Sequence, residues 1–460
     1  MPALPRGFAG CGRNHPTPAT SNQPEPHAVK TTRILVLGGG FGGIYAARHL
    51  EKVFRGNAGV EITLVSRDNF FLFTPMLHEV AASDIDITHI VSPLRTLVRR
   101  TTVLVGNVEV IDLPRRVVTV SHGFERHQHQ VEYDHLVIAV GSTTNFYGLE
   151  GLEQHALTMK SLGDAIHLRN RVIATLEEAD GECAAGEDGL LTVLVAGGGF
   201  AGVETIAAVN DFVRDALKFY PRLNESRIRM VLVHSGDVIL PELGKELGVY
   251  AQHKLGERGV EIITNAKVAA VDASGVTLGD GRRIPSRLVV WTAGTSPHPL
   301  VSDLPCGLDR GRIIVDETLA VPGWPAVWAL GDCAVVPDIR TGKRHPPTAQ
   351  HALREARTVA RNIAAVLVGR APTAFDFKTI GQLAAIGRRT GVARVFGYNF
   401  SGFVAWWLWR TIYLSKLPRL DRKIRVAIDW TLDLIFGKDL VQFLAERAPV
   451  MSTQAVEHPD

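Results

Sequence analysis

The sequence contains few cysteines, and no two of them are spaced to act as a pair. The four cysteines, Cys11, Cys183, Cys306 and Cys333, lie far apart among the 460 residues, and none belongs to a CxxC motif. This spacing indicates neither a disulfide framework nor a zinc site. A reducing compartment fits this cysteine usage best.

Long apolar runs and a strong net charge are also missing. No window reaches the roughly 20 consecutive apolar residues that a membrane-spanning helix needs. The formal net charge is only +3, and no block of lysine or arginine indicates nucleic-acid binding. Hydrophobic residues make up 46% of the chain and charged residues 21%, which is typical of a globular protein of two or three domains.

Residues 1–30 lack the apolar core of a secretory signal. Prolines are scattered among polar residues in this segment, and arginine is too sparse for a good transit peptide. We therefore predict a disordered N-terminal tail.

The sequence contains the same glycine-rich pattern twice. The apolar run 33–37 leads into Gly38–Gly43, and the apolar run 192–196 leads into Gly197–Gly202; both glycine segments read Gly-x-Gly-x-x-Gly and precede a helical stretch. In such a unit the first glycine allows a tight turn, the second admits a pyrophosphate, and the third lets the helix pack on the strand. The helix N-terminus then donates amides to the phosphates. One copy is weak evidence, but two copies predict two dinucleotide-binding units.

Neither unit has the acidic residue that often follows its second strand. Strand 61–65 is followed by Ser66 and Arg67, and strand 230–233 is followed by His234. A carboxylate at this place holds a ribose hydroxyl. Ser66 can bond a ribose more weakly or be only a turn residue, and both interpretations stay open. No arginine follows the second strand to bind a 2′-phosphate, so the choice between NADH and NADPH is open, with NADH favoured.

Several further segments read as strands that end near a ligand. Residues 137–141 and 288–294 are matching apolar runs that end in glycine, and residues 327–330 precede Gly331 and Asp332. The Asp332 carboxylate can accept hydrogen bonds from ligand hydroxyls. Separately, residues 104–120 predict two strands that are joined by a turn at residues 113–116.

Aromatic residues and prolines mark two other segments. Three phenylalanines precede Pro75 in Phe70–Leu77, where they could wall a flat aromatic ligand or simply pack in the core. After Pro346 and Pro347, Thr348 is predicted to cap a helix.

Two dinucleotide units in one chain suggest a bound FAD and a diffusing NAD(P)H. The nicotinamide would then pass a hydride to flavin N5. The protein would have to stack the two rings and stabilise the negative charge of the reduced flavin. The helix that opens at Thr348–Gln350 is our candidate for the second task.

Six motifs taken together are more specific. They are GGGFGG at Gly38–Gly43, FLFTPML at Phe71–Leu77, GGGFAGVE at Gly197–Glu204, WTAG at Trp291–Gly294, ALGDCA at Ala329–Ala334 and PPTAQHA at Pro346–Ala352. In these motifs the chain resembles the flavoproteins with two dinucleotide-binding domains, and among them the single-subunit, non-pumping type II NADH:quinone dehydrogenases. The resemblance implies an α/β fold with two Rossmann-like domains, one inserted in the other, and a C-terminal helical region that associates with a membrane.

The resemblance also implies how the chain divides. Residues 31–155 and 296–370 would form the FAD-binding domain in two parts, with the NAD(H)-binding domain at 156–295 between them. Residues 371–460 would form a C-terminal domain with amphipathic anchoring helices, and residues 1–30 the tail.

The site residues likewise follow from the resemblance. Noncovalent FAD would be held by Gly38, Gly40, Phe41, Gly43, Ser66, Arg67, Thr74, Val108, Ala139, Gly141, Gly331, Asp332, Ala349 and Gln350. NADH would be held by Gly197, Gly199, Gly202, Glu204, Ala293 and Gly294. Glu204 would lie near the nicotinamide, where it orders the ring or carries protons, and Gln350 would lie at the flavin edge that faces the quinone. No metal is implied.

One position departs from the pattern of that family. Its members commonly show AQxAxQ in the helix after Thr348, and the second glutamine lies near the quinone, whereas this chain has Arg354 there. An arginine can donate hydrogen bonds to a quinone oxygen, and its charge would favour a semiquinone or quinol anion. A different electron acceptor is the alternative.

The cysteines disfavour two related classes of flavoprotein. Disulfide reductases need a CxxC or CxxxxC pair beside the flavin, which this chain lacks. Sulfide:quinone reductases use separated cysteines, which Cys183 and Cys333 imitate only loosely.

Two C-terminal helices predict an interfacial anchor rather than a membrane span. The tryptophan-rich segment 402–417 would be ~24 Å long as a helix, against ~30 Å of bilayer hydrocarbon. Segment 421–436 places four apolar residues on one face. They are Ile424, Ile428, Leu432 and Ile435. Nearby cations would favour an anionic leaflet. They are Arg410, Lys416, Arg419, Arg422, Lys423 and Arg425. The alternative is a helix pair packed on its own domain or on a second subunit.

The sequence thus predicts a respiratory flavoenzyme at the cytoplasmic face of the inner (plasma) membrane. It would be attached through residues 402–440, and the anchor could also form a homodimer. A hydride would pass from NADH to FAD and electrons would pass to a quinone, without ion pumping. The alternatives are a soluble NAD(P)H-dependent flavin reductase with another acceptor, and a flavin-dependent redox sensor.

Overall fold

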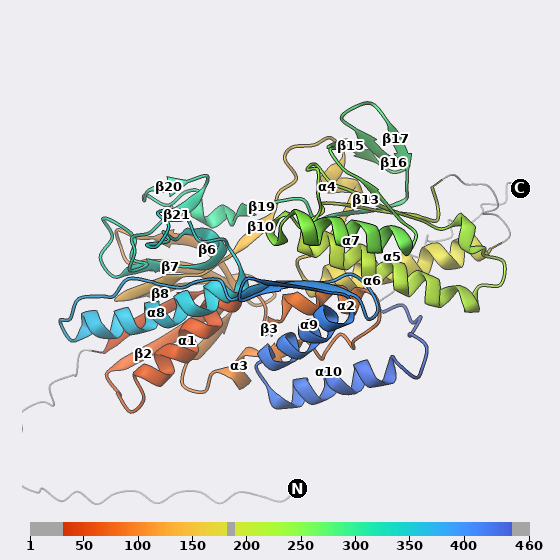
Figure 1. The fold of residues 1–460 in the computed structure, drawn as a ribbon. Coiled ribbons are helices and arrows are strands. Elements are labelled where there is room, and N and C mark those ends of the chain that lie inside the picture. Colours follow the sequence, from red (N-terminus) through yellow and green to blue (C-terminus); the bar gives the residue numbers. More distant parts are fainter. Residues whose placement is uncertain (1–30, 182–188, 444–460) are drawn as a thin grey trace, which may run out of the picture.

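The computed structural model describes residues 31–181 and 189–443 (Figure 1). The tail at 1–30, residues 444–460, Cys11 and Cys183 lie outside the described residues, so the predictions about them stay predictions.

A five-stranded parallel sheet carries the first glycine turn. Its strands are β1 (Thr32–Leu37), β2 (Val60–Ser66), β5 (Thr102–Val105), β9 (His135–Ile138) and β22 (Val327–Ala329). They lie in the order β22-β9-β1-β2-β5. Helices α1 (Phe41–Val53) and α8 (Ala349–Leu367) pack side by side over this sheet (Figure 1). Because both faces of a parallel sheet are covered, the central parts of its strands are apolar and buried.

A second five-stranded parallel sheet repeats this plan. Its strands are β11 (Ala156–Thr158), β12 (Thr192–Ala196), β13 (Arg229–Val233), β14 (Val260–Ile263) and β18 (Leu288–Trp291), in the order β11-β18-β12-β13-β14. The helices of this unit are α5 (Leu162–Asp180), α6 (Phe200–Ala216) and α7 (Lys245–Glu257). The expectation of an α/β fold with two Rossmann-like units is confirmed. Helix α5 ends at Asp180, within the acidic stretch that precedes β12.

The two chain segments that connect the two parallel sheets pair with each other as strands. Strand β10 (Ser142–Thr144) runs antiparallel to β19 (Thr295–Pro297), with Ser142 opposite Pro297. Strand β22 then joins the first sheet only after the second unit is complete. One unit is therefore inserted in the other, as expected. The exact boundaries that the sequence placed at 155 and 295 stay predictions.

Small antiparallel sheets surround the two units. They are β3 (Phe70–Leu72) with β4 (Val91–Pro93); β6 (Asn107–Asp112), β7 (Val117–His122) and β8 (His127–Glu132); β15 (Val268–Asp272), β16 (Gly275–Leu278) and β17 (Arg283–Pro285); and β20 (Leu308–Asp309), β21 (Arg312–Ile314) and β23 (Ala334–Val335), where β21 and β23 are parallel. Short helices α2 (Leu77–Ala81), α3 (Leu94–Leu97) and α4 (Leu152–His155) connect these elements.

The segment predicted as one strand from residue 104 is two strands. Gly106 separates β5, in the first parallel sheet, from β6, which pairs with β7. The Gly106 N–H donates to the Ser66 carbonyl, and a Cβ at Gly106 would lie 2.5 Å from the Ser121 carbonyl oxygen. The chain therefore passes from one sheet to the other at Gly106, where the absence of a side chain lets the backbone approach both Ser66 and Ser121. The turn at 113–116 is confirmed.

The C-terminal region is a three-stranded sheet followed by two helices. The strands are β24 (Gly381–Ala385), β25 (Gly391–Val395) and β26 (Tyr398–Ser401), and the helices are α9 (Gly402–Lys416) and α10 (Leu420–Leu432). The second helix was expected to reach residue 436 but ends at Leu432, because Asp433 pairs with Arg388 and the chain then turns back toward α2. Within the described residues, every helix is too short or too polar to cross a lipid bilayer.

Candidate active site

The first glycine turn is built to admit a ligand backbone. Gly38 has φ +108°, and a Cβ there would lie 2.2 Å from the Ala139 carbonyl oxygen. A Cβ at Gly43 would lie 1.8 Å from the Gly38 carbonyl oxygen, whereas the space within 4 Å of a Cβ at Gly40 is empty. Gly40 caps α1 without any side chain bonding its first-turn amides. Those amides are free to hold an anion.

The second turn repeats this geometry. Gly197 has φ +120°, and a Cβ at Gly202 would lie 1.8 Å from the Gly197 carbonyl oxygen. Gly199 has open space around its Cβ position and caps α6 without a side-chain bond. Both copies of the motif can thus hold a pyrophosphate.

A cavity of about 1520 Å³ opens at the first turn. Small-molecule sites usually measure roughly 300–1,000 Å³, so this cavity has room for a dinucleotide and more. Nearly all residues expected to hold FAD line it, including Gly38, Gly40, Phe41, Ser66, Arg67, Thr74, Val108, Ala139, Gly141, Gly331, Asp332, Ala349 and Gln350. Gly43 lies behind the wall, where it packs α1 on β1.

The aromatic segment serves both roles that the sequence left open. Phe70, Leu72 and Phe73 line the cavity, whereas Phe71 is fully buried and packs edge-on against Phe41 at 4.9 Å between ring centroids. One side of the cavity therefore has an aromatic and aliphatic wall that is supported by the core.

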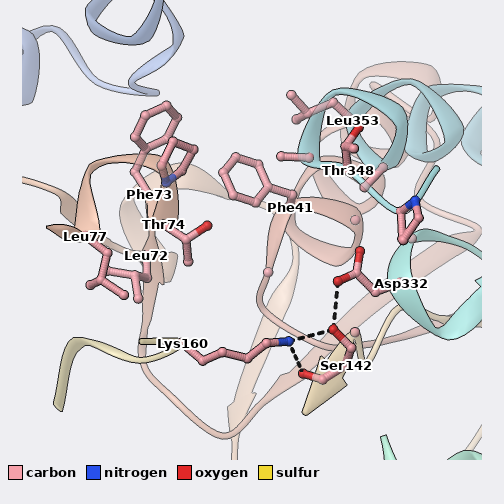
Figure 2. A pocket seen from close by; sticks show the side chains of 18 of the residues that line it. Phe41, Leu72, Phe73, Thr74, Leu77, Ser142, Lys160, Asp332, Thr348 and Leu353 are labelled. Carbon is pink, nitrogen blue, oxygen red and sulfur yellow. Dashed lines mark hydrogen bonds between the residues drawn. The ribbon is translucent and has the colours of Figure 1, made fainter. Parts of the chain in front are cut away.

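A polar chain on the opposite side holds Asp332 (Figure 2). The Lys160 ammonium donates to the Ser142 hydroxyl at 2.7 Å, and that hydroxyl donates to Asp332 Oδ2 at 2.8 Å. Lys160 comes from the turn before α5, and Ser142 comes from the ribbon between the units. These hydrogen bonds leave Asp332 Oδ1 without a partner among the described residues, so this oxygen can accept a hydrogen bond from a ligand hydroxyl.

The helix that the sequence placed after Thr348 begins as predicted, but its cap differs. The Thr348 hydroxyl lies 2.7 Å from His351 Nδ1 instead of bonding the first-turn amides. The amides at Ala349 and Gln350, at the cavity wall, are therefore available to an electron-rich ligand edge.

Two residues of α8 that were expected to face the quinone also line the cavity. Gln350 Nε2 donates to the Gly381 carbonyl at 3.2 Å. Arg354 Nη1 donates to the Gln350 carbonyl at 2.8 Å, and the guanidinium stacks 4.1 Å from the centroid of the Phe377 ring. The stacking orients the guanidinium plane, and within the described residues its other N–H groups have no partner and can donate.

Glu204 lies on the cavity wall at the start of α6 and is 8% exposed. Its Oε1 accepts hydrogen bonds from Trp409 Nε1 at 2.9 Å and from the Ala385 amide at 3.2 Å. Burial raises the pKa of Glu204 to about 8. The carboxyl is therefore mostly protonated at neutral pH, although both bonds favour its ionised form.

The other residues expected to hold NADH do not line this cavity. Gly197, Gly199 and Gly202 lie at the carboxyl end of β12, and Ala293 and Gly294 follow the neighbouring strand β18. They form the equivalent place in the second unit. Glu204 is thus the one member of the predicted NADH set that reaches the cavity.

At its far end the cavity reaches the C-terminal region. The residues there come from β24, β25 and α9 and are mostly apolar: Ile380, Gly381, Gln382, Leu383, Val395, Phe396, Ile412, Tyr413, Ser415 and Lys416. Tyr413 packs on both Phe73 and Trp409, which ties this end to the aromatic wall. The cavity therefore runs from a phosphate-binding turn to an apolar mouth.

The comparisons with known proteins agree with this geometry. A family model for pyridine nucleotide-disulphide oxidoreductases matches residues 32–356, and one for the NDH2 C-terminal domain matches residues 380–439. The type II NADH:quinone oxidoreductase Ndh of Mycobacterium tuberculosis is 34% identical over 434 residues, which cover 90% of this chain and 91% of that relative. The chain belongs to the type II NADH dehydrogenase family.

Other members and structures support the same placement. A probable NADH dehydrogenase of Dictyostelium discoideum is 32% identical, over 90% of this chain and 92% of that protein. The structure of NDH2 from Plasmodium falciparum in complex with NADH is similar in fold, with a TM-score of 0.83 at 20% identity, over 89% of this chain and all of that chain.

The described cysteines of this type II dehydrogenase match neither rival class. Cys333 is fully buried with its Sγ 3.3 Å from the Leu330 carbonyl oxygen, and burial raises the pKa of its thiol to about 11. Cys306 is half-buried and unpaired. A thiol held protonated is a poor nucleophile, so Cys333 is a structural residue.

Four polar residues around the site were not predicted from the sequence. Lys160 holds Ser142 and Asp332, and Glu355 accepts the Gly331 amide at 2.8 Å, which positions the turn before Asp332. His78 and Glu79 are buried beside Glu204. The only signal for the last two was a charged pair inside the otherwise apolar stretch from Leu77 to Ala82.

Proposed function

We propose that this chain passes a hydride from NADH to noncovalently bound FAD and passes the electrons on to a membrane quinone, without pumping ions. The observation that carries the proposal is the cavity that joins a pyrophosphate-binding turn to an apolar mouth in the C-terminal region. Family membership and the two repeated turns support it.

FAD fits the residues that line the cavity. The free amides of α1 would hold its pyrophosphate, and the unpartnered oxygen of Asp332 would hold a ribityl hydroxyl. Ser66 would contact the adenosine ribose. When bound, FAD supplies the hydride acceptor and the route for electrons. The first-turn amides of α8 would stabilise negative charge at the flavin edge.

We assign NADH to the second turn. Gly197, Gly199 and Gly202 would hold its pyrophosphate, and Ala293 and Gly294 would border the nicotinamide half. Glu204 lies between that turn and the cavity, so it can face both ligands. Because its carboxyl is largely protonated, it can donate a proton on the cavity side.

The quinone would enter at the apolar mouth and meet Gln350 and Arg354. The stacked guanidinium of Arg354 has N–H groups free to donate to a quinone oxygen. We therefore propose that Arg354 replaces the second glutamine of related enzymes.

Attachment to a membrane is proposed for the outer face of α9 and α10. The exposed large apolar residues on and after these helices are Phe403, Val404, Trp407, Leu420, Ile424, Ile428, Leu432, Leu434, Ile435 and Phe436. Not every predicted anchor residue lies there. Trp409 is fully buried, and Arg410 is turned inward over the Trp430 ring. The cytoplasmic face of the inner membrane, where NADH is available, and a homodimer through the same region are parts of this proposal.

We assign domains on the same basis. Residues 31–155 and 296–370 would bind FAD, residues 156–295 would bind NADH, and the region from residue 371 would dock on the membrane.

An anaerobic titration tests the proposed function. The purified protein should be yellow and should bleach when NADH is added, because the hydride reduces the flavin. A water-soluble quinone should then restore the oxidised spectrum. A protein that does not bleach is not an NADH dehydrogenase. Recovery only with oxygen or with a protein acceptor would favour a soluble reductase, and negligible turnover would favour a redox sensor.

A further inference from the structure

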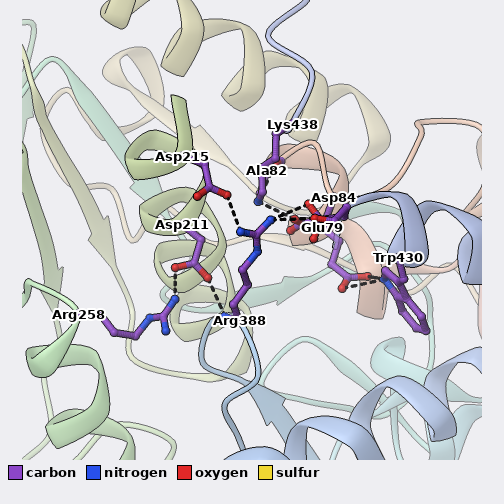
Figure 3. Close-up of polar contacts among 10 residues, drawn as sticks. Glu79, Ala82, Asp84, Asp211, Asp215, Arg258, Arg388, Trp430 and Lys438 are labelled. Carbon is purple, nitrogen blue, oxygen red and sulfur yellow. Dashed lines mark hydrogen bonds and ion pairs between the residues drawn. The ribbon is translucent and has the colours of Figure 1, made fainter. Parts of the chain in front are cut away.

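A second carboxyl, that of Glu79, is buried near the site (Figure 3). Glu79, in α2, is 6% exposed, and both of its oxygens accept the Trp430 indole N–H at 3.2 Å. The preceding residue, His78, lines the cavity, and its Nδ1 lies 3.7 Å from Glu204 Oε2. Helix α2 thus carries Glu79 next to the residue that approaches Glu204.

Polar residues continue from Glu79 toward the surface. Asp84 follows α2 and contacts the buried ammonium of Lys438, which also donates to the Ala82 carbonyl at 3.2 Å. Farther out, Arg388 pairs with Asp215 and Asp433 at 3.0 Å, and 40% of its side chain is exposed. Asp84 interacts electrostatically with both Arg388 and Glu79, so charged and titratable groups continue from the exposed Arg388 toward Glu79.

The groups around Glu79 oppose each other in charge. Arg410 from α9 and Lys438 after α10 favour its ionised form, whereas Asp84 disfavours it. Glu79 also disfavours the ionised form of Glu204. Burial is the largest effect and raises the pKa of Glu79 to about 8. The pKa of His78 is lowered to about 3 by burial, so its ring is neutral.

Glu79 is not paired as a structural charge would be. Among the described residues it forms no ion pair, and its one direct partner is an indole N–H. A buried carboxylate without a cation is costly, so the group is kept protonated instead. Two neighbouring carboxyls thus hold exchangeable protons beside the cavity.

The proposed reaction needs one proton from the medium in each turnover. NADH supplies a hydride, which is two electrons and one proton, but a quinone takes up two electrons and two protons to become quinol. The balance is NADH + H⁺ + quinone → NAD⁺ + quinol. Aromatic rings of Trp409, Trp430 and Tyr413 surround the two buried carboxyls, so a proton that reaches Glu204 from the protein side needs titratable groups to carry it.

We propose that Glu79 is a relay residue that reprotonates Glu204 after Glu204 has given its proton to the quinone. The proton leaves Glu79, reaches Glu204 past His78, and is replaced from solvent along Asp84 and its neighbours. One proton enters for each quinol formed, so charge balances. This inference rests on the proposed function, but it concerns only the quinone half of the cycle.

Glu79→Gln tests the relay, because glutamine keeps the shape and cannot supply the proton. Stopped-flow mixing with NADH should show flavin bleaching at the wild-type rate. Mixing the reduced variant with quinone should show reoxidation slowed by about tenfold or more. The alkaline fall of its rate should begin at lower pH than in the wild type, because Glu79→Gln removes a neighbouring charge that raises the pKa of Glu204. Glu79→Asp should restore part of the rate.

Two controls separate a relay from structural support. Trp430→Phe removes a hydrogen bond that favours the ionised form, so the alkaline fall should move to higher pH. An infrared difference spectrum of reduced minus oxidised enzyme should show a protonated-carboxyl band that Glu79→Gln removes. FAD content and melting temperature of each variant report folding.

The proposal is overturned if Glu79→Gln, with full FAD content, reoxidises at the wild-type rate with an unchanged pH profile. Equal slowing of bleaching and reoxidation would also overturn it, because that result indicates a general structural defect. If the wild type itself bleaches but does not react with quinone, the proposed function fails instead.

Discussion

At the scale of single residues, the two copies of the motif differ in what they should bind. Gly40 and Gly199 both have extended backbone and open space at the Cβ position, so alanine fits either site in the free protein. A methyl group there would collide only with a bound pyrophosphate.

We therefore predict that Gly40→Ala folds but weakens FAD binding by about tenfold or more. Gly199→Ala should keep its full flavin content and show a higher KM for NADH instead. Flavin absorbance after gel filtration and steady-state kinetics measure the two effects. Each variant is the matched control of the other, and the opposite result would exchange the two ligand assignments.

Glu204 should make stability depend on pH. Its folded-state pKa of about 8 lies above its ordinary value of 4.5, because the site is buried. Between these values the folded chain keeps a proton that the unfolded chain has released. The free energy of unfolding therefore falls as pH rises, by up to roughly 1.4 kcal/mol per pH unit.

Glu204→Gln cannot titrate, so its stability relative to the wild type should rise from pH 5 to pH 8. Urea unfolding at several pH values, in excess FAD, measures the difference. Parallel curves for the two proteins would mean that Glu204 is ionised in the folded state.

Single residues also show which parts of the site could be predicted from the sequence and which could not. Gly38, Ser66 and Asp332 were found because each follows an apolar strand, and parallel strands end at one edge of a sheet. Lys160 and Glu355 were missed because their partners, Ser142 and Gly331, are brought to them only by the tertiary fold.

At the scale of elements, α10 presents its apolar face outward. Ile428 is 51% exposed on this face, whereas Val249, on α7 in the second unit, is 49% exposed without a comparable stripe around it. The two positions form a matched pair for testing the anchor.

We predict that Ile428→Asp weakens binding to anionic phospholipid vesicles by about tenfold, since one buried isoleucine contributes roughly 1.5–3 kcal/mol. Val249→Asp should bind as the wild type does. Co-sedimentation with vesicles measures both. If Ile428→Asp binds vesicles normally but dissociates a dimer in analytical ultracentrifugation, the helix face is a subunit interface instead.

Elements were predictable where the local pattern decides them. Most strands of the two parallel sheets and the start of α8 follow from composition, glycines and prolines, whereas β11 and β14 were not predicted. The break at Gly106 was not predictable, because the change of sheet depends on contacts with Ser66 and Ser121 from other strands. The burial of one side of α9 was not predicted, because Trp409 donates a hydrogen bond to Glu204 instead of facing a lipid surface.

At the scale of the whole molecule, the repeated glycine-rich motif predicted two units but not how the two units pack on each other. Helix α6 belongs to the second unit, yet it packs on α2 of the first unit and on β24 of the C-terminal region as well as on its own sheet. The glycine spacing and the helical pattern of the sequence could assign α6 to a strand–turn–helix motif. They could not show that three regions of the molecule pack against this helix.

This enclosure of α6 has a kinetic consequence. Because α6 is packed against all three regions, we expect the two nucleotide sites to keep their separation when NADH binds. The nicotinamide and flavin sites are then aligned when the protein folds, so this alignment costs no further entropy in each catalytic cycle. Flavin reduction should accordingly rise with NADH concentration to a single plateau, without a lag from conformational gating.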